Sequence, residues 1–129
     1  MSKEMDKAVA LRNATDTHYN CAQCVLCAFA DKMGITEEEA FRMGAHFGGG
    51  MKMGATCGAI TSGLMVLGML GKEHVATAKQ FVDVFRAHHD GVLDCADLLR
   101  INAEKGNERK PHCDNMVYEA VAALEEIVE

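Results

Sequence analysis

The chain has 129 residues, of which 49% are hydrophobic and 25% are charged, so it can bury a single core and is not intrinsically disordered. Its formal net charge is −6, and no cluster of lysine and arginine offsets it, which argues against a nucleic-acid partner. The longest apolar run, residues 57–70, is shorter than the roughly 20 residues of a membrane helix. We therefore expect one domain, residues 1–129, without membrane insertion.

The N-terminal segment and the cysteine count bear on the cellular compartment. Residues 1–9 (MSKEMDKAV) are charged and lack the apolar centre of a signal peptide, so we expect a cytoplasmic protein. The chain contains six cysteines. In a reducing compartment, cysteines serve metal or redox chemistry more often than structural disulfides. The composition therefore indicates a cysteine-based site.

Apolar side chains recur at helical spacing along the whole chain, and no segment alternates long enough to predict a strand. We therefore predict an all-α fold, a compact single-domain bundle of about six or seven helices. In chain order, the first helix lies around residues 5–9. The second spans residues 21–33 and ends at Gly34. The third extends to Phe47 and is stopped by the glycines at 48–50.

The centre of the bundle is predicted to lie in the second half of the chain. Residues 57–69 are apolar on nearly every side, so a helix formed by them must be covered by its neighbours. A fifth helix buries Phe81 and Phe85. A short sixth helix follows the N-cap residue Asp94, and Pro111 marks the start of the last helix.

Four cysteines share a position in these predicted helices, because each falls in the first turn: Cys21, Cys57, Cys95 and Cys113. At a helix start, unpaired backbone N–H groups and the helix dipole favour the thiolate, which is the form that attacks disulfides and ligates metals. One cysteine in such a place is more often a small buried hydrophobe. Four of them favour a shared site, so we expect their sulfurs to converge in the folded chain.

Two further cysteines and one histidine are weaker candidates. Cys24 and Cys27 form a Cys-x2-Cys-x2-Cys run with Cys21, which is similar to part of a ferredoxin motif. Steps of three residues rotate successive helical side chains by about 60°, so the sulfurs diverge and we expect Cys24 and Cys27 to pack in the core. His112, next to Cys113, is the best histidine candidate to ligate or protonate a group at the cysteine site.

Several segments carry a resemblance to a known family: residues 19–23 (YNCAQ), 47–51 (FGGGM), 57–59 (CGA) and 64–68 (LMVLG). Together with the downstream Cys95 and Cys113, they make nearly the whole chain similar to the C-GCAxxG-C-C family. The resemblance maps that family's four cysteines onto Cys21, Cys57, Cys95 and Cys113. The chain departs from the pattern at Ser62, where the family has a glycine, and carries Gly63 one place later. Both residues are small, so close packing of the helix survives.

The resemblance implies a small redox-active protein. A similar module in split-Soret cytochromes accompanies an iron–sulfur cluster, so the leading interpretation is a cluster on the four cysteines that serves electron or sulfur transfer. Because family members are often encoded near transporters, the alternative is a zinc-binding or metal-sensing module. The implied partner is a redox protein or a transporter-associated protein, and a homodimer stays open. No catalytic residue is identified, and a thiol–disulfide oxidoreductase is disfavoured because no Cys-x-x-Cys lies in a βαβ context.

Overall fold

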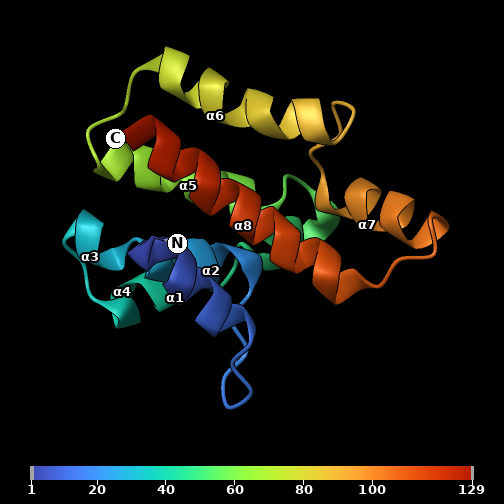
Figure 1. Ribbon diagram of the computed structural model, residues 1–129, viewed down its shortest axis with the longest axis horizontal. Helices are drawn as coiled ribbons and strands as arrows, with labels where there is room; N and C mark the ends of the chain where they lie inside the picture. Colours follow the sequence, from blue (N-terminus) through green and yellow to red (C-terminus); the bar gives the residue numbers. More distant parts are fainter. Residues whose placement is uncertain (1, 129) are drawn as a thin grey trace.

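The computed structural model describes residues 2–128, and in that range it forms helices and no β-strand, apart from one isolated bridge between Thr56 and Asp94 (Figure 1). The helices are α1 (Lys3–Arg12), α2 (Cys21–Ala28), α3 (Ala30–Met33), α4 (Glu37–Gly44), α5 (Gly58–Met69), α6 (Val75–His88), α7 (Cys95–Glu104) and α8 (Arg109–Val128), with a helical turn η1 (Gly50–Gly54) before α5. The all-α prediction is confirmed. Among the described residues, no helix is both long and apolar enough to cross a membrane.

Helices α5 and α2 lie at the centre of the bundle. As its apolar sequence predicts, α5 is covered by α2, α6 and α8, and it buries Ile60, Val66 and Leu67. Helix α2 shares the central place, since residues 22–28 are all buried and the helix contacts α1, α4, α5 and α8. The long helix α8 crosses the molecule between α1 and α6 (Figure 1).

Small residues on α5 allow its neighbours to approach. Ser62 is fully buried, and its hydroxyl donates to the carbonyl oxygen of Gly58 at 2.6 Å, so the serine is satisfied within the helix. A Cβ at Gly63 would lie 2.2 Å from Cζ of Phe81 on α6. A serine therefore fits at position 62, whereas position 63 requires glycine.

The helix predicted over residues 21–33 is two helices. Helix α2 ends at Ala28 and α3 begins at Ala30, and the residue between them, Phe29, has φ −102° and ψ 5°. The Phe29 side chain is fully buried, so the change of direction keeps its ring in the core. Gly34 ends α3 in the left-handed conformation (φ 74°), as predicted.

The next helix is shorter than predicted, because α4 ends at Gly44 instead of Phe47. The side-chain amide of Asn20 donates to the carbonyl oxygens of Gly44 at 3.1 Å and Ala45 at 3.4 Å. A distant residue therefore satisfies carbonyls at the end of α4, which ends without help from the glycines at 48–50.

A left-handed backbone segment follows α4. Gly49, Gly50, Met51 and Lys52 have φ values of 64°, 63°, 58° and 63°. The left-handed conformation costs a residue with a Cβ about 1–2 kcal/mol, so Met51 and Lys52 are held there by the surrounding structure. Gly50 has no substitute, since a Cβ there would lie 2.2 Å from the carbonyl oxygen of Ala55.

Candidate functional site

Cys57 and Cys95 each follow one residue of the isolated antiparallel bridge. Cys57 immediately precedes α5, and Cys95 is the first residue of α7. The isolated bridge joins the residues directly before them. The backbone N–H of Cys57 donates to the Leu93 carbonyl at 3.0 Å, and the N–H of Cys95 donates to the Ala55 carbonyl at 2.7 Å. These bonds hold the starts of α5 and α7 together.

Cys21 and Cys113 form a close pair. Cys21 is the first residue of α2, and its Sγ lies 4.0 Å from the carbonyl oxygen of Cys113. The two thiols also shift each other's pKa, raising that of Cys21 and lowering that of Cys113. Cys113 is the fifth residue of α8, which begins at Arg109. The prediction of a first-turn position is therefore wrong for Cys113, because α8 begins before Pro111.

The two pairs adjoin each other. A Cβ at Gly58 would lie 3.3 Å from the backbone nitrogen of Ala22, so the residues that follow Cys57 and Cys21 are in contact. The charges also interact: Cys57 contributes to raising the pKa of Cys21, and Cys113 contributes to raising the pKa of Cys57. The structure thus brings all four predicted cysteines to the region where the N-terminal ends of α2, α5, α7 and α8 meet.

Burial controls the protonation of Cys57. It raises the pKa of this thiol to about 11 and outweighs the nearby backbone N–H groups of Ala59 and Ile60, which act to lower this pKa. The helix-start effect is therefore present at Cys57, but it is smaller than the cost of burying a negative charge.

Cys21 and Cys95 also depart from the prediction that helix starts produce thiolates. The interaction with the Cys113 thiol, followed by burial, raises the pKa of Cys21. Burial, followed by the charge of Cys113, raises the pKa of Cys95. In the protein without a metal, these two thiols and that of Cys57 are protonated at neutral pH.

Cys113 is the exception. The interaction with the Cys21 thiol lowers the pKa of Cys113 to about 6 against the effect of burial, and the positively charged Arg109 side chain acts in the same direction. Cys113 is also partly exposed. It combines the two properties that make a cysteine reactive.

We expect Cys113 to be the first of the six cysteines to react with iodoacetamide when the metal-free, reduced protein is treated at pH 7. With a pKa of about 6, its thiolate fraction falls about tenfold between pH 7 and pH 5, so its alkylation rate should fall by the same factor. Peptide mass spectrometry over time measures both effects. Faster alkylation of any other cysteine at pH 7 would contradict this assignment.

A capping box fixes the position of Cys21. Asn20 Oδ1 accepts from the backbone N–H of Gln23 at 2.8 Å, and Gln23 Oε1 accepts from the N–H of Asn20 at 2.9 Å. Gln23 Nε2 also donates to the Phe41 carbonyl at 3.0 Å, so the start of α2 is tied to α4. These two positioning residues are absent from the predicted site. The Asn-x-x-Gln spacing before an apolar run is the sequence signal that identifies them.

Cys24 and Cys27 lie in the hydrophobic core. Both are fully buried among core residues. Their sulfurs lie 3.7 Å from the carbonyl oxygens of Tyr19 and Glu37, respectively. Burial raises the pKa of Cys24 to about 11 and that of Cys27 to about 12. Their surroundings are those of packing residues.

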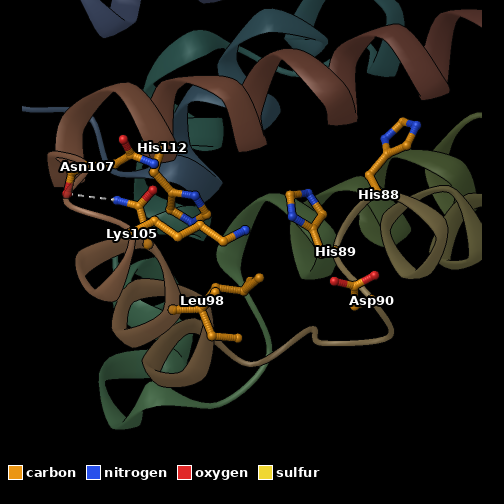
Figure 2. Close-up of a pocket in the computed structure, with 9 residues that line it drawn as sticks. His88, His89, Asp90, Leu98, Lys105, Asn107 and His112 are labelled. Carbon is orange, nitrogen blue, oxygen red and sulfur yellow. Dashed lines mark hydrogen bonds between the residues drawn. The ribbon is translucent and has the colours of Figure 1, made fainter.

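His112 does not face the cysteine site. It lines a pocket of about 160 Å³ between α6, α7 and α8, where its ring centre lies 6.4 Å from that of His89 (Figure 2). The carboxylate of Glu119 contacts both His88 Nδ1 (2.6 Å) and His89 Nε2 (3.0 Å). Adjacent helical residues point about 100° apart, which separates His112 from Cys113. The predicted role of His112 at the cysteine site is therefore wrong.

The fold and the four adjoining cysteines define a small, cysteine-rich, all-α protein. A family model described as "Putative redox-active protein (C_GCAxxG_C_C)" matches residues 19–127. The chain belongs to this family, and the resemblance seen in the sequence is confirmed. No curated protein and no solved structure matches the chain.

Proposed function

We propose that the protein holds an iron–sulfur cluster on four cysteine sulfurs and transfers electrons or sulfur to a redox partner; the ligands are Cys21, Cys57, Cys95 and Cys113. The observation that supports this proposal is that Cys21 adjoins Cys113 and that hydrogen bonds tie together the starts of α5 and α7, next to Cys57 and Cys95. The other two cysteines are enclosed in the core. Thiolate sulfur is the donor that iron–sulfur clusters use.

The donor set fits a cluster by its chemistry, although the side chains are not yet closed around it. Within residues 2–128, no three His, Cys, Asp or Glu side chains are arranged as ligands of one metal ion. Loading would therefore require the four thiols to turn toward a common point and to release their protons. A bound cluster would supply one-electron chemistry; the chain supplies the sulfur ligands and their surroundings.

Two arginines can offset the negative charge of four thiolates. Arg12 is nearly buried, pairs with Asp114 at 2.6 Å, and its charge acts to lower the pKa of Cys21. Arg109 acts in the same direction on Cys95 and Cys113. Charges and hydrogen bonds around the sulfurs are among the factors that set the reduction potential of a cluster.

The alternative is a zinc-binding or metal-sensing module, because four cysteines are also a common set of zinc ligands. A redox measurement separates the two. We expect anaerobically prepared, metal-loaded protein to lose visible absorbance on addition of dithionite, to change its electron paramagnetic resonance spectrum, and to recover both on reoxidation. Zinc has no redox chemistry, so metal-loaded protein that shows neither change would contradict the cluster.

Asn20→Ala should weaken both the fold and the site. Losing the cap should lower the free energy of unfolding by about 1 kcal/mol, and the released start of α2 should lower the amount of iron retained by Cys21. Thr36→Ala is the matched control, since Thr36 Oγ1 caps α4 through the N–H of Glu39 at 3.0 Å without adjoining a site cysteine. Urea unfolding and iron analysis measure the two effects. Equal iron loss in both variants would limit Asn20 to a general stabilising role.

A further inference from the structure

Two adjoining pockets open beside Cys21 and Cys113. The first, of about 430 Å³, is lined by both cysteines, by other residues of α1 and α8, by the loop between α1 and α2, and by Gly49 after α4. The second, of about 520 Å³, extends along the glycine segment that follows α4. The two share four lining residues, so they form one continuous depression: His18, Asn20, Gly49 and Arg109. We call this depression the basic trough.

The charge of the basic trough is opposite to that of the chain. Its lining includes five basic side chains and no carboxylate: Arg12, His18, Lys52, Arg109 and Lys110. The whole chain carries a formal charge of −6. The lining of the basic trough, which includes Cys21 and Cys113, thus contains no carboxylate, and this favours an anionic ligand.

Part of this positive charge is available to a ligand. Arg12 and Lys110 share the single carboxylate of Asp114, at 2.6 Å and 2.9 Å, which leaves one positive charge over. Among residues 2–128, no carboxylate lies within ion-pair distance of Arg109 or Lys52. A guanidinium in this state can bind a carboxylate through two parallel hydrogen bonds.

The position of the cysteines specifies the other end of the ligand. Cys21 and Cys113 line the same pocket as Arg109, and the positive charge of Arg109 acts on the Cys113 sulfur. A ligand held by Arg109 therefore places its next atoms against sulfur. The two pockets have the volume of small-molecule sites, which suits an organic molecule with separate charged and sulfur-bearing groups.

We propose that the basic trough binds a small organic thiol that carries carboxylate groups and presents its sulfur to the four-cysteine site. The proposal rests on the proposed function, since electron or sulfur transfer at that site gives the ligand's sulfur its role. The carboxylates pair with Arg109 and Lys52, and the thiol lies against Cys21 and Cys113. Binding itself makes and breaks no covalent bond.

Glutathione, which has two carboxylates and a thiol, is the probe. We expect anaerobic isothermal titration calorimetry with the metal-loaded protein to show binding that Arg109→Gln weakens about tenfold or more, because a charge-assisted hydrogen bond is lost. Lys52→Gln should weaken it by a smaller factor. Arg100→Gln is the matched control, since Arg100 lies on α7, pairs with Asp97 and Glu104, and does not line the basic trough. S-methylglutathione, which lacks the free thiol, should bind more weakly than glutathione.

Unchanged affinity in both Arg109→Gln and Lys52→Gln would overturn the proposal, and so would equal affinity for glutathione and its S-methyl form. The proposed function is tested separately by the iron and sulfide content of the same samples. Protein that lacks iron but still binds glutathione through Arg109 and its free thiol would contradict the cluster and support the basic trough.

Discussion

Gly63→Ala should lower the free energy of unfolding by up to about 2 kcal/mol, although alanine is the better helix former. The new Cβ would lie 2.2 Å from Cζ and 2.6 Å from Cε2 of Phe81. The Phe81 ring is fully buried, so it can yield only by moving α6 away from α5. Overpacking of this kind costs typically 1–3 kcal/mol, which exceeds the gain of roughly 1 kcal/mol in helix propensity.

Gly68→Ala is the matched control for this prediction. Gly68 lies on the same helix, but a Cβ there would meet nothing within 4 Å. Without a clash, only the higher helix propensity of alanine acts, so this substitution should raise the free energy of unfolding by about 0.5–1 kcal/mol. Urea denaturation of both variants measures the two effects. If they shift stability in the same direction, the close packing of α5 on α6 is not as described.

Replacing any of the four site cysteines by serine should have the second large effect, a loss of metal binding. Each of these substitutions should abolish metal loading, because a serine hydroxyl keeps its proton and binds soft metals poorly. Cys24→Ser and Cys27→Ser are the controls within the same chain. Their sulfurs are enclosed in the core, so we expect full metal loading and a stability loss of about 1 kcal/mol.

Metal analysis of the six single variants, prepared anaerobically, measures this effect. The comparison between the four site variants and the two core variants is the decisive result. If Cys24→Ser removes as much metal as Cys21→Ser, then the Cys-x2-Cys-x2-Cys run is part of the site and the four-cysteine assignment is wrong.

The helices could be predicted where one apolar stripe determines them. The helix predicted over residues 57–69 is α5 within one residue, and the predicted inner face with Phe81 and Phe85 is buried on α6, because the burial of both follows from their own spacing. The end of α4 could not be predicted in this way. It depends on Asn20, whose amide reaches the carbonyl of Gly44 from 24 positions away in the chain.

Prediction of the candidate site from sequence is limited in the same way, because long-range contacts determine it. The four cysteines are predicted from where their helices begin; the structure places Cys21 beside Cys113 and links the segments that precede Cys57 and Cys95. The contacts that do so are long-range, such as the pairing of the segment before Cys57 with the segment before Cys95. A sequence marks where a helix starts, but it does not reveal how deeply that start is buried. Burial therefore reversed the expected pKa shift at Cys57.

The count of iron, acid-labile sulfide and zinc in anaerobically purified protein tests the central claim most directly. A cluster on Cys21, Cys57, Cys95 and Cys113 predicts that iron and sulfide are present together and that both are lost in the Cys57→Ser variant. Iron–sulfur clusters require inorganic sulfide, whereas a zinc site with four cysteines contains none. Stoichiometric zinc without sulfide, retained after iron and sulfide are supplied, would contradict the cluster and identify the protein as a zinc-binding module.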